Sequence, residues 1–327
     1  MNNIYRYQLE KYRGRVSRYV CPQCGRKYTF TKYIDTTHNS YINDKVGKCN
    51  RIDKCGYHYT PRQYFEDNPW LRENNFFQIQ KHRVFENLKF EKAPEHPRSE
   101  PPKSEERGFG LIPEWFARQT LGIECDYKAW LRRVAGASEA ERIIRDYKIG
   151  GCSTSVEGYN AAIFWQCDIE GNYRTGKVMN YDPATGKRRK GSDQLIDWVH
   201  STMRRDGALP EGWQLRQCLY GEHLLRGSQG RMVALAEGPK TAHIGSLLLP
   251  ELVWLATDSM SGLSSELLAV LGGRSVVLFP DEGRAYEEWT RRIEPIAREV
   301  GFSYVVSDFI ERTAPGTGGD IADLVRG

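Results

Sequence analysis

The C-terminal part of the chain alternates between short apolar runs and helical patterns, and this alternation constrains the fold more than any other feature. The segments between the runs read as helices, for example PKTAHIGSLLL and AYEEWTRRIEPIAREV. Strands that alternate with helices build a mostly parallel sheet. We therefore expect an α/β fold in which helices flank that sheet. The apolar runs are 232–236, 252–256, 275–279 and 303–307.

Two of these apolar runs end in acidic residues. Glu237 follows the first run, and Asp281 follows the third. The carboxyl ends of parallel strands open onto one edge of a sheet, so these two side chains can converge. Clustered carboxylates persist where a hard cation compensates their charge, and Mg²⁺ held by one or two carboxylates plus substrate phosphates serves phosphoryl and nucleotidyl transfer. A surface turn without chemistry is the alternative.

Three further residues belong to this predicted edge. Asp320 and Asp323 follow a glycine-rich turn and begin a short terminal helix. Each can add an oxygen ligand, although Asp320 can equally be the N-cap of the helix. Lys240 follows Glu237 and either opens a helix or meets a phosphate.

The N-terminal segment carries a zinc-binding pattern. CPQCG forms a turn that points two thiolates at one metal ion, and a second pair of cysteines lies in GKCNRIDKCGYHYTP. Two such turns joined by a β-hairpin make a zinc ribbon, and the segment between them is rich in the Tyr, Thr and Ile that a hairpin favours. His58 can replace a cysteine of the second, more widely spaced pair, and His38 is a third choice. The predicted ligands of a structural zinc ion are Cys21, Cys24, Cys49 and Cys55.

Charge and composition divide the chain of 327 residues. Residues 1–85 contain 16 Lys and Arg against 7 Asp and Glu, a net charge of +9, so the remainder carries −4 of the overall +5. A basic segment rich in tyrosine suits a polyanion such as nucleic acid, and a solvated surface is the alternative. Residues 86–108 are rich in proline and charge, as in an extended linker. The predicted domains are 1–85, 109–228 and 229–327.

The middle segment combines helices with a hairpin. Residues 113–122 predict a helix, and Ser138 with Glu141 forms a capping-box pattern at the start of a second one. Two strands around a Glu-Gly-Asn turn follow from residue 160, and then a basic turn, KRRK. No apolar run is long enough for a membrane span, and the chain does not begin with a secretory signal, so we expect a cytoplasmic protein with no membrane partner.

In this order of elements the chain resembles bacterial-type DNA primases. Glu-Gly after one strand, Asp-x-x-Arg-Ala after another and a late Asp-x-x-Asp are similar to the Toprim domain, which primases share with topoisomerases and some nucleases. LYGEHLL at 219–225 and AIFWQCDIEGNYRTGKVM in the hairpin resemble primase elements. With the zinc ribbon, the combination is similar to primase-like proteins of phages and mobile elements. The resemblance covers residues 21–58 and about 155–327.

The resemblance implies synthesis of short primers on single-stranded DNA from nucleoside triphosphates, with a replicative helicase as a further partner. Asp281 would hold magnesium or manganese with Asp320 or Asp323, and Glu237 would bind metal or assist proton transfer. Tyr173 and Tyr181 would stack on bases. The phosphate contacts implied are Arg174, Lys177, Arg188, Arg189, Lys190 and Lys240, with Lys187 in the same basic run.

One position departs from the family pattern. Primases carry Asp-x-Asp where this chain has Asp281-Glu282-Gly283. Glu282, Asp320 or Asp323 supplies the missing oxygen, or metal binding is weaker, or catalysis has been lost. The second interpretation is therefore a catalytically inactive DNA-binding protein on the same scaffold, and a Toprim nuclease is the third.

Overall fold

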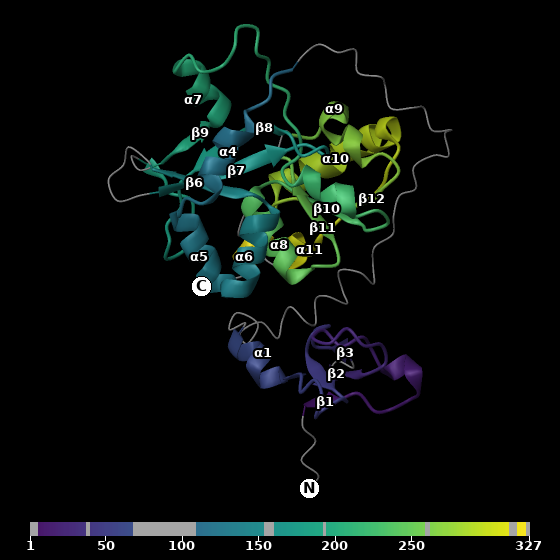
Figure 1. Ribbon diagram of the computed structural model, residues 1–327. Helices are drawn as coiled ribbons and strands as arrows, with labels where there is room; N and C mark the ends of the chain where they lie inside the picture. Colours follow the sequence, from purple (N-terminus) through teal and green to yellow (C-terminus); the bar gives the residue numbers. More distant parts are fainter. Residues whose placement is uncertain are drawn as a thin grey trace. The chain divides into compact units, whose positions relative to one another are not determined.

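The computed structural model describes residues 6–36, 40–67, 109–153, 160–191, 194–258, 262–313 and 319–324. The chain divides into two units, Met1–His82 and Arg83–Gly327, which are drawn in Figure 1. The predicted linker 86–108 and His38 lie outside the described residues. The predicted domain boundaries at residues 85 and 228 stay predictions.

The first unit is a small antiparallel β structure, as the zinc-ribbon pattern predicts. Its sheet has the order β1-β2-β4-β5, with β3 paired to β2. Phe30 is fully buried between Cys21 and Cys49, so a single aromatic ring and the thiols make up most of its small core. The strands are β1 (Tyr7–Leu9), β2 (Phe30–Asp35), β3 (Ser40–Tyr41), β4 (Gly47–Cys49) and β5 (His58–Tyr59), followed by helix α1 (Pro61–Asp67).

The second unit begins with helices and an antiparallel sheet. The predicted hairpin is confirmed, because β7 pairs with β8 around a turn in which Gly171 has a φ of +94°. The sheet order is β6-β7-β8-β9. Its strands are β6 (Ile149–Ser153), β7 (Asn160–Cys167), β8 (Tyr173–Met179) and β9 (Ile196–Trp198). The helices of this half are α4 (Glu114–Leu121), α5 (Asp126–Ala135), α6 (Ala137–Asp146) and α7 (Val199–Arg205).

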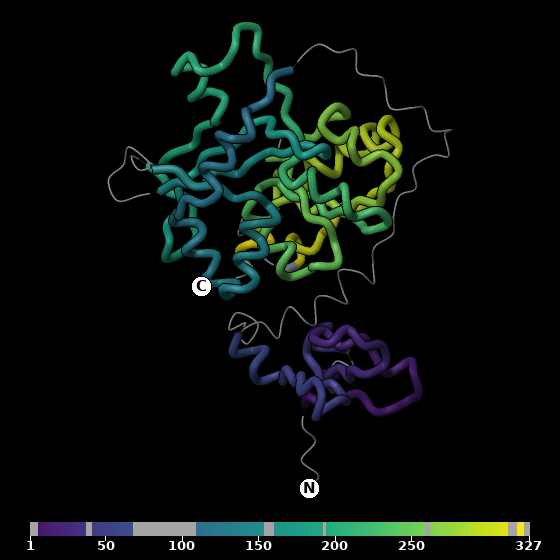
Figure 2. The backbone as a smooth tube through the Cα atoms, in the orientation of Figure 1, coloured from purple at the N-terminus to yellow at the C-terminus, as the bar shows by residue number. Residues whose placement is uncertain are grey.

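The parallel sheet predicted from the alternation is also confirmed, with the order β11-β10-β12-β13. Its strands are β10 (Val233–Ala236), β11 (Val253–Ala256), β12 (Ser275–Phe279) and β13 (Ser303–Val306). The helical elements around it are η3 (Glu222–Gly227), α8 (Pro239–Leu248), α9 (Ser265–Leu268), η4 (Ala269–Leu271), α10 (Arg284–Val300), α11 (Phe309–Thr313) and η5 (Ile321–Leu324). In Figure 2 this half, in green to yellow, lies beside the antiparallel half, in teal.

Helix periodicity explains how these elements pack. In α10 the buried residues include Ala285, Trp289, Ile293 and Ala297, which recur every four residues along one face and enter the core of the parallel sheet. The capping box predicted at Ser138 is wrong. Helix α6 begins one residue earlier, its N-cap is Gly136, and Glu141 pairs with Arg132 of α5 instead.

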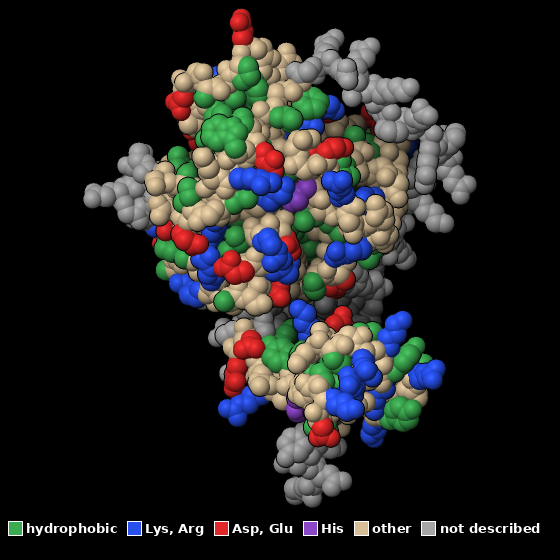
Figure 3. Space-filling view, viewed as in Figure 1, with side chains coloured by type: hydrophobic (Ala, Val, Ile, Leu, Met, Phe, Trp, Pro, Cys, Tyr) green, Lys and Arg blue, Asp and Glu red, His purple; other side chains and the backbone are tan. Residues whose placement is uncertain are grey.

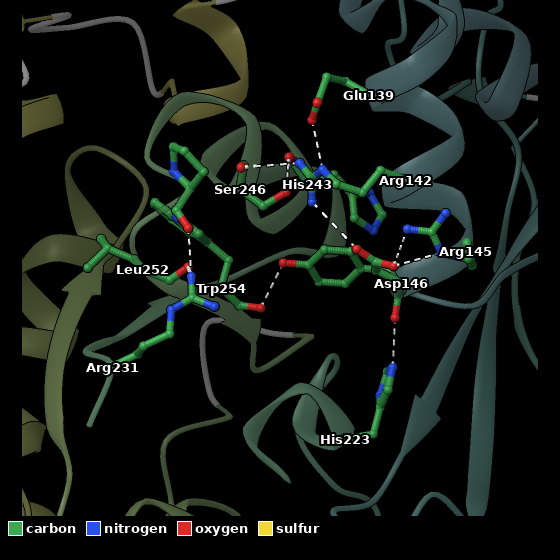
Figure 4. Close-up of polar contacts among 12 residues, drawn as sticks. Glu139, Arg142, Arg145, Asp146, His223, Arg231, His243, Ser246, Leu252 and Trp254 are labelled. Carbon is green, nitrogen blue, oxygen red and sulfur yellow. Dashed lines mark hydrogen bonds and ion pairs between the residues drawn. The ribbon is translucent and has the colours of Figure 1, made fainter. Parts of the chain in front are cut away.

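Backbone carbonyl groups accept several hydrogen bonds around β11, within the parallel half and between the two halves of the second unit (Figure 4). Arg231 donates to the carbonyl of Leu252 at 3.0 Å, and the Tyr147 hydroxyl donates to that of Trp254 at 3.0 Å. His223 in turn donates from Nε2 to the carbonyl of Asp146 at 2.8 Å. Elements far apart in the sequence are thereby fixed around β11.

The Leu-Tyr-Gly element contributes a buried network to the same junction. Tyr220 exchanges two backbone hydrogen bonds with Ala256 at the end of β11, at 2.9 and 3.0 Å. Its hydroxyl lies 2.7 Å from Nε2 of His243, and the hydroxyl of Tyr127 lies 2.7 Å from Nδ1. Burial lowers the pKa of His243 to about 3. The imidazole is therefore neutral, and it donates to one tyrosine while it accepts from the other.

Glu222, at the start of η3, gives a prediction on stability. Burial raises the pKa of Glu222 to about 7, although the backbone N–H groups of Leu219 and Ile169 donate to its carboxylate. The unfolded chain has a pKa near 4.3, so the folded state binds the proton more tightly and the free energy of unfolding falls as pH rises from about 4 to about 7. Between pH 5 and pH 8 this contribution amounts to about 2–3 kcal/mol.

Chemical denaturation of the wild type and Glu222→Gln at pH 5 and pH 8 measures this contribution. Because other acids titrate equally in both proteins, the stability of the wild type relative to the variant is expected to be greater at pH 5. A difference that is the same at both pH values would contradict the assignment to Glu222.

Among the described residues, no helix combines the length and the apolar character needed to span a membrane.

Candidate functional site

The four predicted cysteine ligands converge in the first unit. The sulfur atoms of Cys21, Cys24, Cys49 and Cys55 all lie within 4.8 Å of one another. A tetrahedral zinc ion with Zn–S bonds of about 2.3 Å holds its sulfur atoms about 3.8 Å apart. The distance from Cys21 Sγ to Cys55 Sγ is 3.7 Å, so the thiols fit zinc.

Two glycine turns shape this cluster. The N–H of Gly25 donates to the carbonyl of Cys21 at 2.9 Å, and Gly25 has a φ of +65°. In the second turn Cys55 N–H donates to the carbonyl of Arg51 at 2.8 Å, and Gly56 has a φ of +66°. The longer turn accommodates the wide spacing of the second pair. The backbone N–H of Arg26 lowers the pKa of the Cys24 thiol to about 6, which favours the thiolate that binds metal.

His58 does not join this cluster. It lies on β5, where its ring stacks on Tyr33 and its Nε2 is 3.0 Å from the Tyr33 hydroxyl. The alternative in which His58 replaces a cysteine is therefore wrong, and the wide second turn brings both of its thiols to the site.

The first unit also exposes aromatic rings next to cations. Arg18 lies 4.8 Å from the ring centre of Tyr12, and Arg15 lies 5.5 Å from that of Tyr28. Tyr12 is 70% exposed and Tyr28 is 55% exposed. Figure 3 shows Lys and Arg side chains beside hydrophobic ones on this unit. Such pairs present both charge and a stacking surface to solvent.

In the second unit, acidic residues gather at the carboxyl edge of the parallel sheet. Ala236, the last residue of β10, is level with Ala256 of β11 and Phe279 of β12. The strands therefore end together, with Glu237 directly after β10 and Asp281 two residues after β12. The sheet register brings the two sequence-predicted acids to one place.

Glu237 and Asp281 form a hydrogen-bonded carboxyl pair. Burial raises the pKa of Asp281 to about 9, and the charges of Asp320 and Glu237 add to this rise. Burial also raises the pKa of Glu237, against the hydrogen bond from Asp281. Two such close carboxyl groups retain a proton at neutral pH unless a cation replaces it.

Two oxygen atoms of this pair are candidate ligands for a divalent cation. Glu237 Oε1 and Asp281 Oδ1 are buried and have no hydrogen-bond partner among the described residues. Within the same residues, only the four thiols bring three or more ligand atoms within 4.8 Å of one another. The acidic pair therefore offers two carboxylate ligands and leaves other coordination positions to water or substrate oxygens, as Mg²⁺ commonly has.

Asp320 and Asp323 are engaged with each other. The N–H of Asp323 donates to Asp320 Oδ1 at 3.1 Å, and the N–H of Asp320 donates to Asp323 Oδ2 at 3.2 Å, a reciprocal cap on η5. Asp320 Oδ2 also accepts from the Thr241 hydroxyl at 2.7 Å. The charges of Asp320 and, more weakly, of the exposed Asp323 nevertheless raise the pKa of Asp281. A ligand role for either residue stays a prediction.

Gly283 occupies a position that suits glycine. It is the N-cap of α10 with a φ of +82°, a conformation that L-residues rarely adopt. Its N–H donates to Glu311 Oε1 at 2.6 Å. An aspartate at this position would be strained in the backbone conformation seen here.

Two predicted lysines lie beside the acids. Lys177 of β8 donates to the carbonyl of Asp258 at 2.8 Å, and its charge acts to lower the pKa of Glu237. Lys240, in the first turn of α8, lies 5.0 Å from the ring centre of Trp130. Burial lowers the pKa of Lys240, while Asp320 acts in the opposite direction. Both cations belong to the same acidic edge.

The other predicted phosphate contacts differ in position. Arg174 is buried in an ion pair with Asp168 at 2.7 Å, and its guanidinium lies 3.7 Å from the ring centre of Phe109. Arg188 and Lys190 are exposed on the basic turn, and Arg189 is half-buried. Gly186 in the same turn has a φ of +62° and packs against Trp130. A Cβ at this position would lie 2.1 Å from the ring, so no larger residue fits here without a shift.

The predicted stacking of Tyr173 and Tyr181 on bases is wrong. Each side chain is 4% exposed. Tyr173 packs edge-on against Trp165, and Tyr181 packs against Tyr127 in the core. Both rings therefore face inward from the antiparallel sheet.

Sequence reasoning missed Asp258. It follows β11 by two residues, as Asp281 follows β12, and it is buried beside Lys177. The strand-end pattern that identified Asp281 applies equally to LVWLATD and would have found Asp258.

Two family models match parts of this chain, and several solved structures are similar to it. Residues 126–282 match a domain of unknown function (DUF6371), and residues 5–70 match a zinc beta-ribbon finger. No curated protein matches the sequence.

The solved structures that are similar to the chain are phage and bacterial primases. The primase fragment of the bacteriophage T7 primase-helicase protein is 12% identical, over 94% of this chain and 92% of that chain, with a TM-score of 0.40. The Aquifex aeolicus primase, with zinc-binding and RNA polymerase domains, is 12% identical over 94% and 77%, with a TM-score of 0.36. The RNA polymerase domain of Mycobacterium tuberculosis primase DnaG is 11% identical over 65% and 80%, with a TM-score of 0.39.

Proposed function

We propose that the chain is a primase-like nucleotidyltransferase that synthesises short primers on single-stranded DNA. The observation that carries this proposal is the carboxyl pair of Glu237 and Asp281, whose buried, unpartnered oxygens lie at the carboxyl edge of a parallel sheet beside Lys177. The zinc ribbon and the sequence elements that resemble primases support it. Under this proposal the second unit is a Toprim-type catalytic core of a phage or mobile-element protein.

The residues at the edge have distinct roles in this reaction. Glu237 and Asp281 would hold a magnesium or manganese ion, which would neutralise charge on the triphosphate when the attacking hydroxyl bonds to the α-phosphorus and pyrophosphate leaves. Lys177 and Lys240 bind phosphate oxygens of the incoming nucleotide. The alternative role of Glu237 is to accept the proton of the attacking hydroxyl in place of binding the metal ion. Asp320 holds Thr241 and stabilises the entry to α8.

Template-directed synthesis tests the proposal. Single-stranded DNA is incubated with the protein, labelled ribonucleotides or deoxyribonucleotides, and magnesium or manganese. Short labelled products that depend on the template are expected. Absence of product with either metal, together with salt-sensitive DNA binding, would overturn the catalytic proposal.

Gly283 favours a second candidate function. The primase pattern has a second acid at this position, where this chain has glycine. Gly283 therefore supports the alternative of a DNA-binding protein that acts in replication on the same scaffold but does not catalyse. A Toprim nuclease has no such specific support. In either functional candidate, a replicative helicase is a proposed partner.

The exposed cations give a prediction that both candidates share. Binding to single-stranded DNA is expected to weaken as salt rises, with a slope in log affinity of about −0.7 for each phosphate neutralised. Arg188→Ala with Lys190→Ala should therefore reduce the slope by about 1.4. Fluorescence anisotropy over a salt series measures it.

The matched control removes two exposed arginines from another element. Arg291→Ala with Arg298→Ala on α10 changes the net charge equally and should leave the slope unchanged. Equal slopes in all three proteins would show that the basic turn does not contact phosphates.

A further inference from the structure

Lys177 is held in place by a residue of the neighbouring sheet. Its ammonium lies 2.8 Å from the backbone carbonyl oxygen of Asp258 and 3.6 Å from Asp258 Oδ1. The ring of Trp198, the cross-strand neighbour of Lys177 on β9, lies 5.6 Å from the same ammonium. Lys177 belongs to the antiparallel sheet and Asp258 to the parallel one, so this contact spans the junction between them.

Asp258 is itself fixed in an unusual conformation. Its φ is +64°, in the left-handed region, where residues other than glycine are uncommon and aspartate is one of those that occur most often. Its Oδ2 accepts a hydrogen bond from Gln166 Nε2 at 2.7 Å, and its side chain is only 3% exposed. In this conformation both its carbonyl and its carboxylate are directed to Lys177. Such backbone strain at a buried polar residue is typical of functional sites.

Asp258 is not placed to share the cation of the carboxyl pair. The strand order is β11-β10-β12, so Asp258 and Asp281 follow strands that lie on opposite sides of β10. Neighbouring strands are about 4.8 Å apart, which separates the two strand ends by about 10 Å. Asp258 instead contacts Lys177, whose charge acts on Glu237.

We propose that Asp258 is a positioning residue that holds the Lys177 ammonium beside the Glu237 carboxylate, where it meets a phosphate of the incoming nucleotide. This inference rests on the proposed function. It gives a role to Asp258, an acid after β11 that the sequence analysis did not select. It also makes the effect of Asp258 on catalysis depend on Lys177.

A double-mutant cycle tests this dependence. Primer synthesis and binding of manganese-ATP are measured for the wild type, Asp258→Asn, Lys177→Ala and the double variant. Asparagine keeps the shape and tolerates the left-handed conformation. Asp258→Asn is expected to lower kcat/KM about 10-fold, mainly through KM, and to have little further effect once Lys177 is alanine. An equal loss in both backgrounds, or no loss in either, would overturn the proposal.

A readout that needs no activity separates this inference from the proposed function. The rate at which Lys177 is acetylated by an N-hydroxysuccinimide ester, followed by mass spectrometry, reports how firmly its ammonium is held. Asp258→Gly should raise this rate several-fold, because glycine retains the backbone conformation but lacks the carboxylate. Asp197→Asn, on the strand β9 next to Lys177, breaks the contact of Asp197 with Arg205 of α7; it is the matched control and should leave the rate unchanged.

The two measurements have separate outcomes. If the wild type neither makes primers nor binds the nucleotide, the proposed function fails, and the acetylation rate then decides whether Asp258 positions Lys177. An unchanged rate in Asp258→Gly would overturn the positioning role even in an active enzyme.

Discussion

Replacing Glu237 with glutamine is expected to abolish primer synthesis while the protein stays folded. The substitution keeps the side-chain shape but removes the charge that, with Asp281, compensates a divalent cation. Because burial acts on both carboxyl groups, water can do little to compensate the charge of the cation in place of Glu237. We expect a loss in kcat/KM of about 10²–10³-fold or more, since each preorganised charge of this kind acts directly on the transition state.

The control for this variant is Glu287→Gln. Glu287 is exposed on α10, so the same chemical change there should leave synthesis intact. DNA binding should be unchanged in both variants, because the basic turn and the zinc-ribbon unit are not altered. Full activity in Glu237→Gln would show that the carboxyl pair is not the catalytic centre, and loss of DNA binding would show that the variant acts through folding.

Removal of zinc is expected to unfold the first unit and leave the second unit folded. The first unit buries only Ile42 and Val46 among its described hydrophobic residues besides Phe30 and the cysteines, so we expect its stability to depend on the metal. Structural zinc contributes about 10–16 kcal/mol in small zinc-finger peptides, more than such a core can supply. The second unit has its own two apolar cores, which contain none of the four ligands.

Hydrogen exchange measured by mass spectrometry resolves the two units. After chelation, protection should be lost in residues 6–67 and kept in the strands of the parallel sheet. Cys21→Ser with Cys24→Ser should give the same pattern and lose bound zinc. Cys152→Ser, a half-buried cysteine outside the ligand set, should keep its zinc. Unchanged metal content in the double variant would refute the four-cysteine site.

Local patterns explain why much of the fold could be predicted. Strands β10, β11 and β12 of the parallel sheet are buried on both faces and read as short apolar runs, and α10 shows its buried face in the spacing of Ala285, Trp289 and Ile293. Because both residues follow parallel strands, Glu237 and Asp281 can be predicted to lie at one edge of the sheet without knowing any tertiary contact. The CPQCG turn is equally local, because its geometry follows from residues adjacent in the sequence.

Contacts between distant residues account for what the sequence could not predict. The sequence around Arg174 does not show whether its guanidinium pairs with Asp168, as it does in the structure, or contacts a phosphate. The inward direction of Tyr181 depends on Tyr127, which lies on another element. His58 was a plausible ligand by spacing, and only the pairing of β4 with β5 places it beside Tyr33.

The carbonyl contacts around β11 have a consequence for how this protein can diverge. Arg231, Tyr147 and His223 donate to main-chain oxygens of Leu252, Trp254 and Asp146, so these bonds do not depend on which side chains the accepting residues carry. Substitutions at the accepting positions keep these hydrogen bonds if the backbone keeps its path, but Leu252 and Trp254 are buried, so their size is constrained by the core. The donating side chains are constrained differently. Replacing Arg231, Tyr147 or His223 removes the donor group, and its hydrogen bond is lost.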